Sequence, residues 1–321
     1  MSMKGMSLLT LEEFSGDQIT QLIDRAIELK NLKQARKFPK NLENRNFCLV
    51  FLKPSTRTRT SFVVASCDEG AHLEIFGHED IRFGIKESVK DIARVMGRMF
   101  DGIAFRGYDH SVVEDLARYS GVPVWNGLSD DHHPTQALAD LMSLKEEFGE
   151  IRGRKLAFVG DGSSNVVRSL VIAGAKTGLD FRVVSPTELQ PDRATIEPYL
   201  TAADPDFRLT ITEDVTEGVA GCDAIYGDIW LSMGEEHLVK HRIEILEPYR
   251  IDEAMFAKTG NAKAIFLHCL PALHDDETEF AKSHPGVIDV TDDVFEGARS
   301  RVFDQSENRM HTIKAIMVET V

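Results

Sequence analysis

The sequence predicts an α/β protein of two doubly wound domains, each built on a parallel sheet, with a ligand-binding cleft between them. Its 321 residues exceed what one ordinary hydrophobic core serves, so two domains are expected. Short apolar stretches alternate with helical stretches of roughly 10 to 15 residues, a pattern typical of parallel sheets covered on both faces.

The first half of the chain supplies one series of these elements. Residues 10–31 have the spacing of an amphipathic helix, because Phe14, Ile19 and Leu22 recur on one face. Further helices are expected from Ser55 onward and over residues 87–100, 111–120 and 133–149. Strands are expected at short apolar stretches, at residues 46–52, 72–76, 102–107 and 122–127.

The second half supplies another series after a break near residues 146–153. Its strands are expected within residues 155–162, 180–186, 206–214, 222–230 and 262–271, with a helix over 163–178. The domains are therefore placed at 1–148 and 149–304. A final helix, about 305–321, begins too late to belong to either sheet, and we expect it to pack back on the first domain.

Composition limits the classes of partner. Lys and Arg number 37 against 52 Asp and Glu, a formal charge of -15 without a basic block, which disfavours nucleic acid. No stretch has about 18 uninterrupted apolar residues, so neither membrane spanning nor secretion is expected. The scattered cysteines form no zinc-binding pattern and indicate reduced thiols in a cytoplasmic protein; they are Cys48, Cys67, Cys222 and Cys269.

The stretch "KPSTRTRTS" follows an apolar strand and opens a helix. Ser55 is a suitable N-cap, but Arg57 and Arg59 lie where the positive end of the helix dipole favours acidic residues. Free backbone N–H groups, hydroxyls and two guanidiniums together would bind a phosphate. Alternatively, Ser55 only caps the helix and both arginines point into solvent.

Other polar residues follow the expected strands. Ligands of parallel α/β sheets bind at the carboxyl ends of the strands. The residues in that position are Ser55 to Thr58, Arg106, Asn126, Gly160 to Gly162, Asp228, His268 and Cys269.

Common cofactor motifs are incomplete. In "VGDGSSN", Asn165 occupies the third glycine position of the dinucleotide-binding turn, and no phosphate-binding G-x-x-x-x-G-K-[ST] motif occurs. The pairs His132/His133 and His237/His241 lack a carboxylate or thiol cluster that would complete a metal site. We therefore expect no cofactor and no metal.

Several motifs together resemble ornithine carbamoyltransferases, of the aspartate/ornithine carbamoyltransferase family. They are "FLKPSTRTRTSF", "VPVWNGLSDDHHPTQALADL", "DIWLSMGEE", "HCLPALHDDET" and "VFDQSENRMHTIKAIM". "STRTR", "HPTQ" and "HCLP" mark the carbamoyltransferase group, and "SMG" marks the ornithine branch. The resemblance runs from about Phe51 to the C-terminal helix.

The resemblance implies transfer of a carbamoyl group from carbamoyl phosphate to the δ-amine of ornithine, in a homotrimer or a multiple of trimers. It implies carbamoyl phosphate contacts at Ser55, Thr56, Arg57, Thr58, Arg82, Arg106, His133, Gln136, Cys269, Leu270 and Arg309. It implies ornithine contacts at Asn165, Asp228, Ser232 and Met233. Of these residues, the catalytic ones would be Arg57, Arg106, His133, Asp228 and Cys269, with Cys269 not a covalent nucleophile.

The chain also departs from the family pattern. Arg82 stands where family members have the glutamine that a trimer lends to a neighbour's carbamoyl phosphate, and Ser164-Asn165 replaces the usual Asn-Asn pair. Two alternatives therefore stay open: a carbamoyltransferase for another amine, and a catalytically silent relative that acts as a binding subunit.

Overall fold

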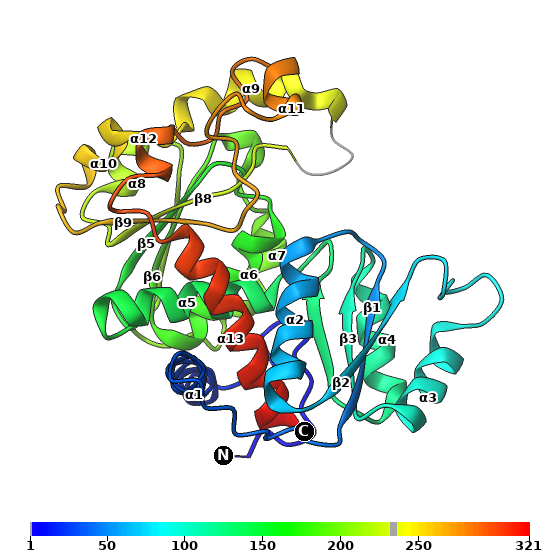
Figure 1. The fold of residues 1–321 in the computed structure, drawn as a ribbon. Helices are drawn as coiled ribbons and strands as arrows, with labels where there is room; N and C mark the ends of the chain where they lie inside the picture. The colour runs from blue at the N-terminus through cyan, green and yellow to red at the C-terminus, as the bar shows by residue number, and fades with distance from the viewer. Residues whose placement is uncertain (1, 232–235) are drawn as a thin grey trace. The chain divides into compact units, whose positions relative to one another are not determined.

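The computed structural model describes residues 2–231 and 236–321. The chain forms two compact units, one of Met1–Met142 with Glu307–Val321 and one of Ser143–Ser306 (Figure 1). Each unit contains one parallel sheet, so the predicted α/β class with two parallel sheets is confirmed. Among the described residues, no helix has the length and apolar character needed to cross a membrane.

The sheet of the first unit has the order β2-β1-β3-β4. Its strands are β1 (Asn46–Phe51), β2 (His72–Gly77), β3 (Gly102–Arg106) and β4 (Val124–Leu128). The helices of this half are α1 (Gly16–Gln34), α2 (Thr56–Glu69), α3 (Val89–Met99), α4 (His110–Ser120) and α5 (Pro134–Phe148). The chain ends in α13 (Val302–Thr320), which belongs to this unit from Glu307 onward.

Alternating side chains bury both faces of this sheet. Cys48 and Val50 of β1 join the cluster formed with α3 and α4. On the other face, Phe47 packs edge-on against Trp125, with ring centroids 5.2 Å apart. The Trp125 indole N–H donates to Thr320 Oγ1 of α13 at 3.0 Å, so the last helix closes this face of the core.

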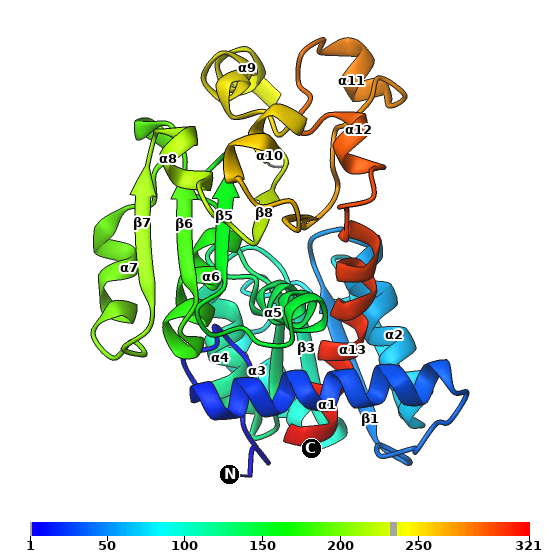
Figure 2. The ribbon, with the colours of Figure 1, turned by 90° about the vertical axis from the view of Figure 1, so that its left-hand side faces the viewer.

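The sheet of the second unit has the order β7-β6-β5-β8-β9 (Figure 2 shows β7, β6 and β5 side by side with the same direction). Its strands are β5 (Lys155–Val159), β6 (Asp180–Val184), β7 (Arg208–Thr212), β8 (Ala224–Gly227) and β9 (Ile265–His268). Helix α6 (Asn165–Thr177) has ten of its 13 residues buried, as expected of a helix packed on most sides.

The remaining helices of this unit are short. They are α7 (Arg193–Leu200), α8 (Val215–Val219), α9 (Val239–Leu246), α10 (Glu253–Thr259), α11 (Glu279–Ser283) and α12 (Asp292–Phe295), with 3-10 turns η1 (Thr187–Leu189), η2 (Glu236–Leu238) and η3 (Glu247–Tyr249). The expected helix length of roughly 10 to 15 residues is therefore wrong after residue 187. Helices this short are stabilised by packing and caps rather than by intrinsic propensity.

Both sheets reverse their strand order at one point, which is where parallel α/β sheets bind ligands. In the first unit this point lies between β1 and β3, whose ends lead to Ser55 and Arg106. In the second it lies between β5 and β8, whose ends lead to Asp161 and Asp228.

A buried charge cluster fastens α13 to α2, two helices that lie alongside each other in Figures 1 and 2. Asp68 Oδ2 accepts from Lys314 Nζ and from Lys33 Nζ, each at 2.6 Å. The Lys314 side chain is only 1% exposed. Burial alone would raise the pKa of Asp68, but the hydrogen bonds from Lys314 and Lys33 lower it below its ordinary value.

Asp68→Asn should lower the free energy of unfolding by about 3 kcal/mol at pH 7, because it leaves the buried Lys314 ammonium without its counter-charge. The lowered pKa means that this contribution is present above the unfolded-state value of about 3.9 and is lost as the pH falls through the folded-state value. Urea unfolding at several pH values measures this, and the difference from wild type should shrink below a pH of about 4.

Glu28→Gln is the matched control. Glu28 pairs with Arg25 at 2.6 Å, but its side chain is 58% exposed. A surface pair of this kind contributes less than about 1 kcal/mol. Equal losses in the two variants would contradict a special role for Asp68.

Candidate active site

At the start of α2, the hydroxyl of Thr58 accepts several hydrogen bonds. Ser55, in extended conformation, caps the helix by accepting from Thr58 N–H at 3.3 Å, as predicted. The Thr58 hydroxyl is buried and accepts from Arg106 Nη1 at 3.2 Å and also from Arg309 Nη2. No acidic residue lies in the first turn of this helix. Two guanidiniums thus converge on a helix N-terminus, the arrangement that binds anions.

Each guanidinium is also oriented by a second acceptor. Arg106 Nε donates to the Lys53 carbonyl at 3.2 Å. Arg309 Nη1 donates to Gln136 Oε1 at 2.9 Å, and Gln136 Nε2 donates to Asp140 Oδ1 at 2.8 Å. Arg106, Gln136 and Arg309 are all buried. These contacts fix the direction of both arginines before any ligand arrives.

Concentrated positive charge lowers the pKa values of two groups in this cluster. Burial, and then the charges of Arg309 and Arg57, lower the pKa of Arg106 to about 9. Burial and the charges of Arg309, Arg106 and Arg57 hold the pKa of His133 well below its ordinary value. His133 is therefore neutral at pH 7. A bound anion would relieve this repulsion.

The other residues predicted for this site occupy different environments. Arg57 is partly buried, whereas Arg59 and Thr56 are exposed, so the solvent-facing interpretation describes Arg59 but not Arg57. Arg82 is exposed and pairs with Glu79, with Nη2 and Oε2 2.5 Å apart. Hydrogen bonds therefore join one group of predicted residues, and Arg57 is close enough to influence Arg106 and His133. The group consists of Ser55, Thr58, Arg106, Gln136 and Arg309.

In the second unit, Asp228 follows β8 and meets Cys269, which follows β9. The Cys269 thiol donates to Asp228 Oδ1 at 2.9 Å, and Ile229 N–H donates to the same oxygen at 2.8 Å. Burial raises the pKa of Asp228, although the hydrogen bonds from Cys269 and from Ile229 N–H oppose the rise. Leu270 follows with a positive φ of 58°.

Asn165 opens α6, with Ser164 as the N-cap that accepts from Val167 N–H at 3.4 Å. Ser232 and Met233 lie outside the described residues.

Sequence reasoning missed one carboxylate beside these groups, Asp140, and the partner of another, Asp161. Asp140 stands four residues after Gln136 on one helix, a spacing that predicts contact and could have been used. Asp161 pairs with the buried Arg242 of α9 at 2.8 Å, and the charge of Asp161 raises the pKa of Asp228. Because Arg242 lies 81 positions away, no local pattern could have revealed that pair.

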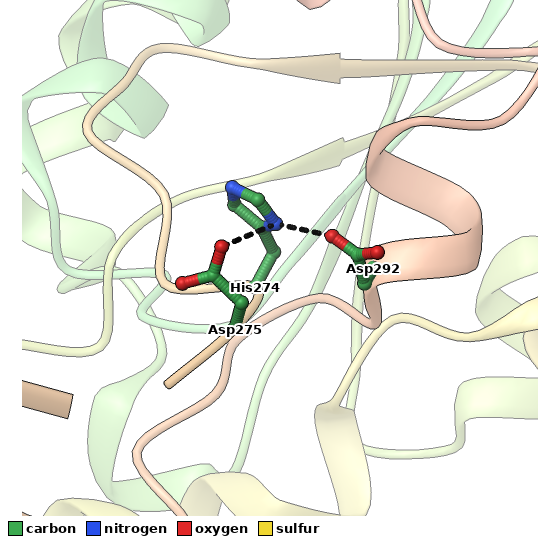
Figure 3. A group of neighbouring side chains, drawn as sticks. All are labelled: His274, Asp275 and Asp292. Atoms are coloured by element: carbon green, nitrogen blue, oxygen red, sulfur yellow. Dashed lines mark hydrogen bonds and ion pairs between the residues drawn. The ribbon is translucent and has the colours of Figure 1, made fainter. Parts of the chain in front are cut away.

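One group of side chains in the described ranges has ligand atoms close enough to hold a metal ion: His274, Asp275 and Asp292 (Figure 3). Its contacts are accounted for without an ion. His274 Nδ1 lies 2.8 Å from Asp292 Oδ1 and 3.7 Å from Asp275 Oδ2, while the ring stacks on Phe295 with centroids 3.8 Å apart. The group fastens a loop to the start of α12.

Comparison with known proteins identifies the family. The domain described as "Aspartate/ornithine carbamoyltransferase, carbamoyl-P binding domain" matches residues 6–146. The domain described as "Aspartate/ornithine carbamoyltransferase, Asp/Orn binding domain" matches residues 152–320. The chain belongs to the aspartate/ornithine carbamoyltransferase family. The resemblance inferred from its motifs is confirmed.

Relatives of this carbamoyltransferase match it over the full length. Ornithine carbamoyltransferase 2, phaseolotoxin-insensitive, of Pseudomonas syringae pv. actinidiae is 54% identical and covers 100% of this chain and 98% of its own. The catabolic ornithine carbamoyltransferase of Bacillus licheniformis is 48% identical, with 100% and 97% covered. The structure of ornithine carbamoyltransferase from Pyrococcus furiosus is 38% identical with a TM-score of 0.92, and covers 100% and 98%.

Thr58→Val should weaken phosphate binding to this carbamoyltransferase about tenfold or more, because two charged donors lose a shared acceptor. Phosphate should raise the unfolding temperature of the wild type, and the variant should need more phosphate for the same rise. Thr60→Val, on the exposed side of the same helix, is the control and should respond like wild type. An equal phosphate response in all three proteins would remove Thr58 from the anion site.

Proposed function

We propose that this carbamoyltransferase moves the carbamoyl group of carbamoyl phosphate to the δ-amine of L-ornithine, giving L-citrulline and phosphate. One observation carries the proposal: the buried guanidiniums of Arg106 and Arg309 meet at Thr58, at a helix N-terminus without acidic residues. The family and the names of its relatives supply the identity of the two substrates.

The phosphate end of carbamoyl phosphate is assigned to the start of α2. Ser55, Thr56, Arg57 and Thr58 would surround it with hydroxyl, N–H and guanidinium donors, and Arg309 would add a further charge. As the C–O bond to phosphate breaks, negative charge grows on the departing oxygen. Donors already held in place stabilise that charge without rearranging, which lowers the barrier.

The carbonyl end is assigned to Arg106, His133 and Gln136. His133 is neutral, and its Nδ1 lies 3.4 Å from Thr135 Oγ1. A neutral imidazole keeps one ring N–H, which His133 can donate to the carbonyl oxygen. Arg106 and His133 would then polarise the carbonyl as the amine attacks its carbon. Cys269 and Leu270 are proposed as further contacts of carbamoyl phosphate.

The amino acid is assigned to Asn165, Asp228, Ser232 and Met233. Asp228 and Asn165 would bind the α-amino and α-carboxylate groups, with Cys269 near the amino groups. The δ-amine must lose a proton on or before binding, since only the neutral amine has a lone pair to attack with. Formation of the C–N bond expels phosphate, and the second proton leaves the new amide nitrogen.

A homotrimer or a multiple of trimers is proposed as the assembly, in the cytoplasm. Exposed apolar side chains in the first unit support association: Ile85, Val95 and Met99 are 70%, 49% and 69% exposed. Val95 and Met99 border an apolar groove lined by β2 and α3, which a neighbouring subunit would cover. Ile85 and Arg82 belong to the loop that would reach the neighbouring site.

An amine panel tests the function. With carbamoyl phosphate, citrulline formation from ornithine should exceed carbamoylation of putrescine, N-acetylornithine or aspartate by about 10⁴-fold, because buried polar groups reject a substrate that leaves them unpaired. Product formation is measured at equal amine concentrations. Equal turnover with putrescine would favour the alternative of another amine. No turnover with any amine would favour the silent binding subunit.

Mixing two variants tests the role of Arg82. Arg57→Ala should lower turnover by about a hundredfold or more, since a charge contact to the transition state is lost. Arg82→Ala should also be severely impaired if Arg82 gives two charge-assisted hydrogen bonds to the phosphate of a neighbouring site. Dissociating and reassociating equal amounts of the two should restore activity at about a quarter of the sites, because each shared site draws Arg57 and Arg82 from different chains at random.

Arg59→Ala is the matched control for Arg57→Ala, because Arg59 is exposed on the same helix. It should keep wild-type activity. Mixed trimers without any recovered activity would place Arg82 outside the neighbour's site. In that case Arg82 would act in the same chain's site as Arg57, or outside the site altogether, where it pairs with Glu79.

A further inference from the structure

A buried histidine holds the turn that follows β9. His268 ends the strand with its side chain fully buried. Its Nδ1 accepts from Leu270 N–H at 2.9 Å, and its own backbone N–H donates to Gln305 Oε1 at 2.8 Å. Leu270 has a φ of 58°, in the left-handed region that residues other than glycine rarely adopt. The bond to His268 thus fixes an unfavourable backbone conformation next to Cys269.

This hydrogen bond determines the tautomer of the ring. Leu270 N–H can only donate, so His268 Nδ1 must carry a lone pair, and the ring proton must reside on Nε2. The Nε2 atom faces Asp289 Oδ1 at 3.5 Å, which is long for a hydrogen bond. Among the described residues, neither atom has a hydrogen-bond partner of its own. A carboxylate oxygen opposite Nε2 favours the proton on that nitrogen.

Asp289 also fastens the far side of the turn. Its Oδ2 accepts from Leu273 N–H at 3.0 Å, while its backbone N–H donates to the Leu273 carbonyl at 3.0 Å. Asp289 is 2% exposed, so its carboxylate oxygens are shielded from solvent. A second His–Asp pair, His274 with Asp292, follows at the exposed end of the same loop (Figure 3).

We propose that His268 and Asp289 are positioning residues: Asp289 keeps the His268 proton on Nε2, and His268 Nδ1 holds Leu270 N–H, so that Cys269 and Leu270 keep the conformation used in carbamoyl transfer. The inference rests on the proposed function, because it assigns these residues to that reaction. Neither His268 nor Asp289 needs to touch a substrate.

Two substitutions of His268 test its two interactions separately, one at Nδ1 and one at Nε2. His268→Asn places an amide oxygen where Nδ1 lies, so it can still accept from Leu270 N–H, but it cannot reach Asp289. His268→Gln places its amide nitrogen near Nε2, so it can donate to Asp289, but it offers Leu270 no acceptor. If the role of His268 were only structural, the less stable of the two variants would also be the less active. If His268 positions Leu270, the variant that keeps the acceptor for Leu270 N–H stays more active even where it is less stable.

We expect His268→Gln to lower kcat about 10- to 100-fold, the range found when a group that orients an active residue is lost. His268→Asn should have a kcat at least about tenfold higher than that of His268→Gln. It should nevertheless unfold at a lower temperature than His268→Gln, because it leaves Asp289 without its partner. Asp292→Asn, in the outer pair, is the control and should keep kcat within about twofold, since its amide oxygen can still accept from His274. Rates are compared per folded protein, with the folded fraction measured by circular dichroism.

A direct measurement needs no active enzyme. In ¹⁵N spectra of histidine-labelled wild-type protein, the signals of His268 are identified by their absence in His268→Asn. They should show a protonated Nε2 and an unprotonated Nδ1. A proton on Nδ1, or a His268→Asn variant at least as inactive as His268→Gln, would overturn the proposal. If wild-type protein formed no citrulline, the proposed function would fail, while the tautomer measurement would still test the inference.

Discussion

The charge gathered around the Thr58 hydroxyl is the constraint on which the first unit depends. Arg106 and Arg309 both donate to that one oxygen, at a helix N-terminus that has no acidic residue in its first turn. Burial and repulsion between these cationic groups are unfavourable, as the lowered pKa values of Arg106 and His133 show. A dianionic ligand would offset this repulsion, so the proposed affinity for phosphate and the lowered pKa values have the same origin.

The position of α13 brings Arg309 into the charge cluster around Thr58. Arg309 lies 251 positions after Thr58, and only a helix that returns to the first unit can bring the two together. The Asp68 carboxylate fastens that helix through Lys314, five residues beyond Arg309. One rigid helix thereby carries both the Lys314–Asp68 ion pair and Arg309, the arginine proposed to bind phosphate, so the ion pair also holds Arg309 in place.

Local patterns predicted the parts of the site that depend on local geometry. The Ser55 cap, the strand ends at Arg106 and Asp228, and the parallel sheets follow from short-range spacing and from the rule for carboxyl ends of strands. Long-range pairs such as Asp161–Arg242 and His268–Asp289 leave no trace in spacing. The short helices after residue 187 were missed because four to eight residues hold too few turns for a period to appear.

The two assigned ligand groups show opposite electrostatics, and each matches its substrate. In the first unit, burial and mutual repulsion disfavour the cationic forms, and carbamoyl phosphate brings negative charge. In the second, burial raises the pKa of Asp228, and ornithine brings an ammonium group that favours the carboxylate. A chain with a formal charge of -15 repels an anion at long range. At physiological salt that repulsion is screened beyond about 8 Å, so the buried guanidiniums decide whether the anion binds.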